Sequence, residues 1–154
     1  AGPFGDLWLR PASEPILCVA GGSGLAPIKA LLEDAARQRC TRPAVLLFGA
    51  RTQRDLYCLA ELGALERSWD GRFEFRAVLS EESAESTWSG ARGLVTDVVR
   101  QLPEQFIHDC HVYTCGPPAM IDVLETTLHE MRTDMQHFYA DRFVTRIPGA
   151  AQSL

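Results

Sequence analysis

The chain has 154 residues, of which 46% are hydrophobic and 23% charged, a composition typical of one globular domain with a full core. Twenty acidic residues against 15 basic ones give a formal net charge of -5 at pH 7, so no basic field exists to bind nucleic acid or an anionic membrane. The apolar runs at 16–20 and 44–48 are far shorter than the roughly 20 residues of a membrane span. We therefore expect a soluble domain whose partners include no nucleic acid and no membrane.

The cysteines are odd in number and lack the spacing of a disulfide framework; they lie at 18, 40, 58, 110 and 115. Free thiols of this kind indicate a reducing compartment, so a cytoplasmic location is expected. A zinc site would have to use the cluster of His108, Cys110, His111 and Cys115. No second ligand pair follows at zinc spacing, and a strand over these residues would point its side chains alternately to opposite faces. No metal site is therefore predicted.

Apolar runs with β-forming residues recur about every thirty residues, and helical patterns lie between most of them. The runs are 16–20, 44–48, 73–79, 110–115 and 137–144, and the helical patterns are 25–35, 59–67, 94–102 and 120–131. Pro117 and Pro118 stand where the last helix should begin, which suits a residue with a fixed φ and no N–H. Gly93 opens the third helical pattern and Pro103 closes it. This alternation predicts βαβ units and a parallel sheet.

The order of the strands follows from their polarity. Residues 72–76 alternate charged and apolar side chains, as an edge strand does, whereas 16–20 is apolar throughout, as a central strand is. The order 3-2-1-4-5 satisfies both. We therefore predict an α/β fold, an open, doubly wound, five-stranded parallel sheet with helices on both faces (Rossmann-like). Its ligand crevice would lie between strands 1 and 4, at the loops 21–27 and 115–118. Residues 81–90 are expected to form an exposed loop.

A glycine-rich run, GGSGLAP, occupies residues 21–27, directly after the first strand and at the start of the first helix. Glycines there allow positive φ and let backbone N–H groups approach a pyrophosphate at a helix N-terminus. An ordinary strand-to-helix turn is the alternative, but the order of strand, glycines and helix favours phosphate binding. The candidate residues are Gly22, Ser23, Gly24 and Pro27. Pro27 stands where the usual dinucleotide fingerprint has Gly or Ala.

A second run, TCGPP at 114–118, ends the fourth strand on the other side of the same crevice. By itself it is typical of a strand exit with a small buried cysteine. Together, GGSGLAP, FGARTQRDLY at 48–57 and YTCGPP at 113–118 resemble the NAD(P)H-binding half of the ferredoxin-NADP reductase superfamily, over nearly the whole chain. VLSEES at 78–83, WSGARGLVTDVV at 88–99 and HFYADRF at 137–143 are most similar to reductase components of bacterial multicomponent oxygenases, both dioxygenases and phenol- or methane-type monooxygenases.

The resemblance implies a function. Such reductases take a hydride from NADH onto FAD and pass electrons through a [2Fe-2S] centre to an oxygenase or ferredoxin. Residues 1–10 resemble the last strand of the flavin-binding barrel, 11–144 would be the NAD(P)H-binding domain, and 145–154 a flexible tail. The family's flavin-binding signature, Arg-x-Tyr-Ser/Thr with a downstream Gly-rich loop, is absent from the sequence. We therefore expect the nicotinamide-binding domain of a larger reductase, inactive without its flavin-binding domain.

Site residues carry over from the resemblance one by one. Gly22, Ser23 and Gly24, with Pro27 behind them, would cradle the pyrophosphate. Beside the nicotinamide, helping to place it against the flavin, would lie the run of Thr114, Cys115, Gly116 and Pro117. Phe143 matches the aromatic residue that covers the flavin ring in relatives, with Phe138 and Tyr139 as further candidates for that role. A core phenylalanine in the last strand is the alternative for Phe143.

Coenzyme choice depends on the end of the third strand. NADPH-using members resemble one another in a Ser-Arg pair there, whereas this chain has Ser80 followed by Glu81. A carboxylate accepts hydrogen bonds from a ribose diol but repels a 2′-phosphate, so NADH is predicted. Gly49 and Arg51, after the second strand, would lie on the adenosine side. Asp55 is expected to cap the following turn rather than to bind a ligand.

Two further functions remain as alternatives. The same fold serves nucleotide-binding regulatory or electron-transfer subunits that do not turn over NADH, since fold does not fix function. A methyltransferase could use the glycine run for S-adenosylmethionine, but that reading explains neither TCGPP nor the lack of an acidic residue at the end of the second strand. A Ser or Cys hydrolase is less favoured than either alternative, because no G-x-S-x-G elbow is present.

Overall fold

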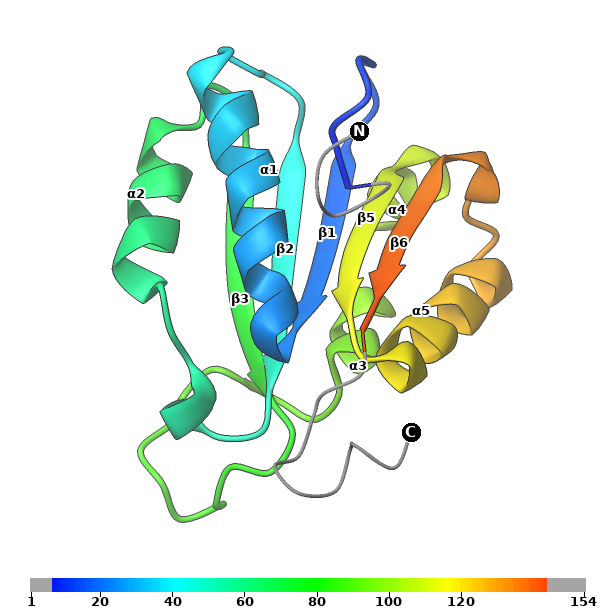
Figure 1. The fold of residues 1–154 in the computed structure, drawn as a ribbon. Helices are drawn as coiled ribbons and strands as arrows, with labels where there is room; N and C mark the ends of the chain where they lie inside the picture. Colours follow the sequence, from blue (N-terminus) through cyan, green and yellow to red (C-terminus); the bar gives the residue numbers. More distant parts are fainter. Residues whose placement is uncertain (1–6, 144–154) are drawn as a thin grey trace.

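A parallel sheet runs through residues 7–143, the part of the chain that this computed structural model describes (Figure 1). Within that part it has six strands, in the order β4-β3-β2-β1-β5-β6. They are β1 (Ile16–Gly21), β2 (Ala44–Ala50), β3 (Phe73–Leu79), β4 (Ala91–Arg92), β5 (His111–Gly116) and β6 (Phe138–Arg142). All neighbouring strands pair in parallel. The doubly wound parallel fold predicted from the sequence is therefore confirmed, with its crevice between β1 and β5.

The predicted count of five strands is wrong. The five expected strands keep their neighbours, but the sheet does not end at β3, because Ala91 and Arg92 pair with Val78 and Leu79. The order consequently begins with β4 rather than with the strand expected at the edge. Only two residues of the returning chain pair with β3, and a strand of two residues shows no periodicity that a sequence could reveal.

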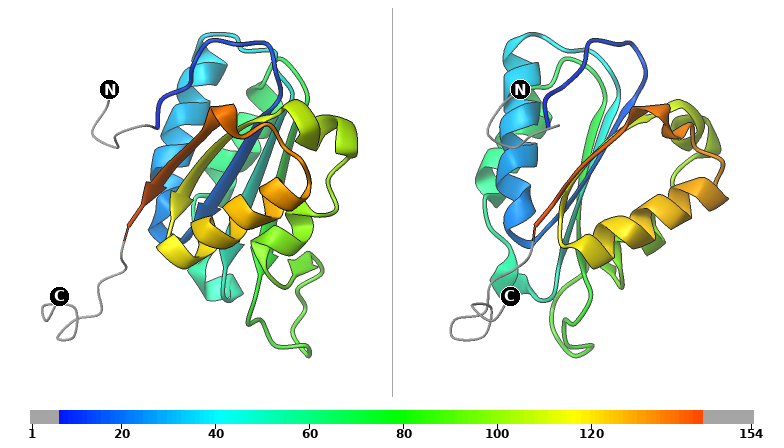
Figure 2. Two further views of the ribbon diagram at one scale, coloured as in Figure 1. Left: turned by 90° about the vertical axis from the view of Figure 1, so that its right-hand side faces the viewer. Right: turned by 45° about the vertical axis from the view of Figure 1, so that its right-hand side comes forward.

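Helices cover both faces of the sheet (Figure 2). α1 (Leu25–Arg37) and α2 (Leu59–Ser68) lie on one face, and α3 (Val95–Val99), α4 (Glu104–Asp109) and α5 (Pro118–Glu130) on the other. α1, α2 and α5 match the helical patterns. The helix expected over 94–102 is present as α3 but is shorter, because it ends at Val99, and α4, which follows Pro103, was not predicted. Pro103 accepts hydrogen bonds from the N–H groups of Phe106 and Ile107 and so starts a helix instead of closing one.

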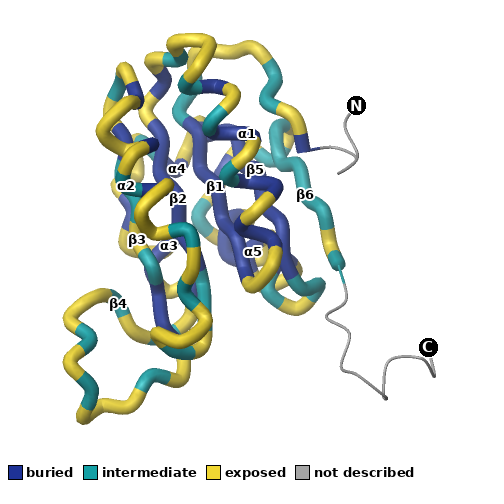
Figure 3. The backbone as a smooth tube through the Cα atoms, turned by 60° about the vertical axis from the view of Figure 1, so that its left-hand side comes forward, coloured by how far each residue is buried: buried dark blue, intermediate teal, exposed yellow. Residues whose placement is uncertain are grey.

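Two cores, one on each face of the sheet, explain why β1 is apolar throughout. Alternate residues of a strand point to opposite faces, and Ile16, Cys18 and Ala20 pack towards α1 and α2, whereas Leu17 and Val19 pack towards α3, α4 and α5. All five are fully buried. Figure 3 shows the buried strands enclosed by exposed helix faces and loops.

The amino-terminal end of the sheet is tied together by a buried arginine. Arg42 is 6% exposed, and its guanidinium donates to the carbonyl oxygens of Glu14 at 2.6 Å and Arg10 at 3.1 Å. Its own carbonyl accepts the indole N–H of Trp69 at 2.9 Å. Because these bonds join the segment before β1, the start of β2 and the end of α2, Arg42 holds three separate stretches of the chain, two through its guanidinium and one through its backbone carbonyl.

Several predictions fall on the ends of the chain. Residues 1–6 and the expected tail at 145–154 lie outside the described residues, so the barrel strand proposed for 1–10 stays a prediction. Residues 7–10 join no strand of the sheet, although Leu7 is buried in the core beneath α1. No helix between residues 7 and 143 is both long and apolar enough to cross a membrane. Within the same range, no three His, Cys, Asp or Glu side chains are grouped to hold a metal ion.

Candidate functional site

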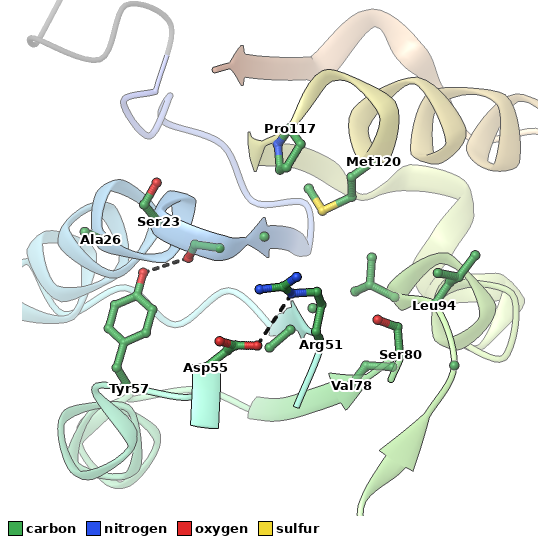
Figure 4. A pocket seen from close by; sticks show the side chains of 16 residues that line it. Ser23, Ala26, Arg51, Asp55, Tyr57, Val78, Ser80, Leu94, Pro117 and Met120 are labelled. Atoms are coloured by element: carbon green, nitrogen blue, oxygen red, sulfur yellow. Dashed lines mark hydrogen bonds and ion pairs between the residues drawn. The ribbon is translucent and has the colours of Figure 1, made fainter. Parts of the chain in front are cut away.

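A pocket of about 900 Å³ opens at the carboxyl ends of β1, β2 and β3 and at the start of α5 (Figure 4). It lies where the strand order reverses, which is the position predicted for the crevice. Its volume is within the range of cofactor sites. The residues that line it are Gly21, Gly22, Ser23, Ala26, Gly49, Ala50, Arg51, Asp55, Tyr57, Val78, Ser80, Gly93, Leu94, Val95, Pro117 and Met120.

The glycine turn forms one wall of this pocket. Gly22 has φ +57°, which only glycine adopts without strain, and a Cβ at this position would meet no atom within 4 Å. Gly22 and Ser23 are exposed, and the short turn η1 (Gly22–Gly24) leads directly into α1. The first N–H groups of a helix have no partner within it and carry its partial positive charge. The turn therefore presents backbone donors and open space to an anionic group.

Gly24 and Pro27, also predicted to cradle a phosphate, have a different place. A Cβ on Gly24 would lie 2.1 Å from the carbonyl oxygen of Cys115, so this glycine permits the close approach of the turn to β5. Pro27 is buried on the inner side of α1. Neither residue is among those that line the pocket. Both lie on the buried side of the turn, where they allow it to pack against the sheet.

The end of β5 contributes less surface than the sequence indicated. The Thr114 hydroxyl donates to the carbonyl oxygen of Val19 at 2.8 Å, and Cys115 is 1% exposed and packs in the core beneath α1. Burial, and to a lesser extent the Asp141 carboxylate, raise the pKa of the Cys115 thiol to about 12. Pro117 is the member of the predicted run that lines the pocket. The Cys115 thiol thus faces the core. In this run, the part expected to lie beside the nicotinamide is therefore the backbone and not the thiol.

Thiol burial leads to a direct prediction. Iodoacetamide at about pH 8 reacts with exposed thiolates, so we expect it to modify the half-buried Cys40 and Cys58 and to leave Cys18, Cys110 and Cys115 unmodified in the folded protein. Peptide mass spectrometry after timed labelling measures the five rates separately. Modification of Cys115 as fast as that of Cys40 would show that its thiol is open to the crevice, contrary to the structure.

Phe143 lies beside the same strand end. Its N–H donates to the carbonyl oxygen of Gly116 at 3.1 Å, so the chain continues along β5 beyond the last residue of β6. The side chain is half-buried and packs against the core beneath α1. It is therefore neither a fully enclosed core residue nor part of the pocket wall, and its role over a flavin stays a prediction.

Two charged side chains, Arg51 and Asp55, lie in the part of the pocket away from Pro117 and Met120 (Figure 4). The Arg51 guanidinium lies 3.8 Å from the Asp55 carboxylate. Asp55 also accepts the N–H of Thr52 at 3.3 Å, so it belongs to the capping box of its own turn, η2 (Gln53–Asp55), in which Thr52 is the N-cap. It does not cap the following turn, as was predicted, and it lines the pocket. Ser80 lines the pocket, whereas Glu81 is exposed outside it.

Glu82, in the loop after β3, is hydrogen-bonded to Gln53 in the turn that carries Asp55. Its carboxylate accepts the backbone N–H of Gln53 at 3.0 Å and the side-chain amide of Gln53 at 2.6 Å. These bonds lower the pKa of Glu82. The Arg92 guanidinium donates to the carbonyl oxygens of Glu82 and Ser83 at 3.1 and 2.9 Å and fixes the loop after β3. The rim therefore keeps a negative charge at neutral pH.

Sequence reasoning missed several residues of the pocket wall. Tyr57, Val78 and Leu94 lie within the runs 48–57, 78–83 and 88–99, but none of them was given a role at the site. The pairing of β2 with β3 and the return of the chain through β4 bring them to the pocket. Met120 was assigned to the apolar face of its helix. Met120 packs against the core beneath α5, as expected, and its thioether also lies over Gly21 and Gly116, each of which would hold a Cβ 2.6 Å from a Met120 atom. Glycine at both positions was the one signal that a large side chain lies there.

Comparison with known proteins decides the family. The family model for the oxidoreductase NAD-binding domain matches residues 18–126. The chain belongs to this family. The resemblance to the NAD(P)H-binding half of the ferredoxin-NADP reductase superfamily is thereby confirmed. Both glycine-bearing strand ends, at 21–24 and 114–118, lie inside the matched residues.

Relatives in this NAD-binding family are reductases of oxygenase systems. The chain is 44% identical to the electron transfer component of a xylene/toluene monooxygenase from Pseudomonas putida, over 95% of this chain and 41% of that protein. It is 33% identical to reductase component 1 of a terephthalate 1,2-dioxygenase from Comamonas sp, over 96% of this chain and 44% of that protein. The chain thus spans less than half the length of these relatives.

Solved structures agree. An Amycolatopsis cytochrome P450 reductase superimposes with a TM-score of 0.79 and 28% identity, covering 94% of this chain and 43% of that one. A ferredoxin reductase of carbazole 1,9a-dioxygenase shares the fold, with a TM-score of 0.76 over 89% of this chain and 40% of that one. The NAD-binding fold and its family therefore rest on independent observations.

Proposed function

We propose that this chain is the nicotinamide-binding domain of an NADH-dependent flavoprotein reductase, which passes a hydride from NADH to FAD and electrons onward to an oxygenase. The observation that carries the proposal is the pocket at the carboxyl ends of the strands, with the open turn at Gly22 and Ser23 on its wall. That turn supplies backbone donors at a helix start, which is where dinucleotide-binding folds hold a pyrophosphate.

The residues present fit a dinucleotide along the pocket. Gly22 and Ser23 would hold the pyrophosphate with their N–H groups, while Gly24 and Pro27 keep the turn against β5. The adenosine would lie towards Gly49, Arg51 and Ser80, and the nicotinamide towards Pro117 and Met120, near the backbone of Thr114, Cys115 and Gly116. Phe143, beside Gly116, would meet the flavin from the other side. The coenzyme supplies the hydride, and the chain binds and orients it.

NADH is proposed over NADPH because the arginine that lines the adenosine end of the pocket is paired and two acidic residues follow Ser80. Arg51 is paired with Asp55, and Ser80 is followed by Glu81 and by Glu82, whose carboxylate is fixed by Gln53. A 2′-phosphate dianion would meet these carboxylates at short range, whereas a ribose diol would not. The exposed side chain of Glu81 would act through its charge at the rim and not by contact within the pocket.

The remaining partners follow from the relatives. FAD and a [2Fe-2S] centre would lie outside this chain, in a flavin-binding domain and a ferredoxin-type domain of the same protein. An oxygenase or a ferredoxin component would receive the electrons. The names of the xylene/toluene monooxygenase and terephthalate dioxygenase components support this proposal. Five free thiols favour a cytoplasmic location.

Anaerobic mixing with NADH tests the proposed reaction once the flavin-binding domain is restored to the chain. The proposal predicts bleaching of the flavin absorbance at a rate that saturates with NADH, and a Gly22→Ala variant should need more NADH for the same rate, because its φ is strained. The alternative, a nucleotide-binding subunit that does not turn over NADH, predicts binding without flavin reduction. Saturable NADH binding with a flavin that stays oxidised would overturn the proposed reaction.

A further inference from the structure

A tyrosine hydroxyl contacts the backbone of the glycine turn. The phenol of Tyr57 donates to the carbonyl oxygen of Gly22 at 2.7 Å, across 35 positions of sequence (Figure 4). The ring packs edge-on against Phe48, with 5.5 Å between centroids and an angle of 90° between planes. Burial raises the pKa of Tyr57 above its usual value, so the hydroxyl keeps its proton at neutral pH. The residue is thus fixed by its ring and donates with its hydroxyl.

The bonded carbonyl belongs to the peptide that forms the start of the helix. Gly22 already accepts the N–H of Leu25, so its carbonyl oxygen points along the helix and receives two donors. In a trans peptide the N–H lies opposite the C=O, and the Ser23 N–H therefore points out of the helix start, where an anion binds. Ser23 lines the pocket.

Gly22 has φ +57° and no Cβ, so no side chain on this residue hinders rotation of the Gly22–Ser23 peptide. The hydrogen bond from the Leu25 N–H to the Gly22 carbonyl oxygen is one restraint on that rotation. A turned peptide would present its carbonyl oxygen, instead of an N–H group, to a phosphate. The Tyr57 hydroxyl opposes that change, because rotation would break its hydrogen bond.

We propose that Tyr57 is a positioning residue that holds the Gly22–Ser23 peptide with its N–H towards the pocket and so confers affinity for the diphosphate of the ligand. This inference rests on the proposed function, since it assumes that the pocket takes a dinucleotide. The positioning role differs from a general stabilising role in one respect. Tyr57 should affect the affinity for ligands that carry a diphosphate and should not affect the affinity for the nucleoside alone.

Calorimetric titration of Tyr57→Phe with ADP-ribose and with adenosine tests this. The variant keeps the ring on Phe48 and loses one hydrogen bond. We expect about threefold to tenfold weaker binding of ADP-ribose, the range expected for one such bond, and an unchanged affinity for adenosine. Thr126→Val is the matched control, because it also removes a hydroxyl that donates to a backbone carbonyl, that of Asp122, but on α5 away from the pocket. It should bind ADP-ribose like the original chain.

A double-mutant cycle with Gly22→Ala shows whether Tyr57 acts through the turn. Alanine strains the backbone at φ +57°, so the peptide should already be displaced, and Tyr57→Phe should then weaken ADP-ribose binding by less than twofold further. Equal losses for ADP-ribose and adenosine, or no loss in Tyr57→Phe, would overturn the role of Tyr57. Failure of the unaltered chain to bind ADP-ribose would instead contradict the proposed function.

Discussion

Gly24→Ala is expected to lower the free energy of unfolding by about 3 kcal/mol, the upper part of the range for overpacking, and to weaken coenzyme binding. The added Cβ would lie 2.1 Å from the carbonyl oxygen and 2.6 Å from the carbonyl carbon of Cys115. These are backbone atoms of a buried central strand, so the glycine turn must move away from β5. The backbone of Gly24 has φ -67°, which alanine adopts freely, and the clash is therefore the sole cause of the expected loss.

Gly63→Ala is the matched control for Gly24→Ala. Gly63 lies inside α2, where an added Cβ would meet only the far end of the Arg67 side chain, at 3.3 Å. Alanine is favoured over glycine in a helix by about 0.5–1 kcal/mol, so this variant should be as stable as the original chain or more so. Urea unfolding of both variants measures the difference. Equal stability of Gly24→Ala and Gly63→Ala would show that the turn does not press against β5.

Arg42→Met is expected to destabilise the fold by about 3 kcal/mol without affecting the pocket. The substitution removes the guanidinium hydrogen bonds to the carbonyl oxygens of Glu14 and Arg10, and a hydrogen bond from a charged group contributes about 1.5–3 kcal/mol. The pocket lies at the carboxyl ends of the strands, opposite these bonds, so affinity for NADH should stay within about twofold of the original.

Arg37→Met serves as the control for Arg42→Met. The Arg37 side chain is 70% exposed and, within residues 7–143, forms an ion pair with Asp34 alone, at 3.5 Å. The loss of such a surface pair costs less than about 1 kcal/mol. Thermal and urea unfolding of both variants provide the comparison, and NADH titration of folded protein provides the binding result. An Arg42→Met variant as stable as Arg37→Met would contradict the role given to the buried guanidinium.

The order of the strands could be predicted because the strands differ from one another in their pattern of polar and apolar residues. The apolar run in β1 predicted a central strand and the alternating pattern in β3 an edge strand. The structure confirms the first and places β3 one strand in from the edge, beside β4. β4 could not be predicted, since two residues define it. α4 was missed because a proline at a helix start and one after a helix end look alike in sequence.

The site was predicted unevenly, for a physical reason. Gly22, Ser23 and Arg51 stand at strand ends, and topology alone brings those ends to one crevice. Cys115 also stands at a strand end, but the sequence does not reveal which face of the sheet its thiol takes, and it faces the core. Tyr57 ends the run 48–57, but nothing in that run predicts its contact with Gly22. That contact depends on how the chain leaves β2, which only the folded backbone settles.

Parallel calorimetric titrations of this chain with NADH, NADPH and ADP-ribose test the central claim most directly. The account predicts micromolar to millimolar binding of NADH and ADP-ribose, with NADPH about tenfold weaker, corresponding to about 1.4 kcal/mol, because Glu81 and Glu82 repel a 2′-phosphate. Tighter binding of NADPH would contradict the proposed coenzyme and leave the family intact. Absence of binding by all three ligands would contradict the assignment of the pocket at Gly22 and Ser23 as a dinucleotide site.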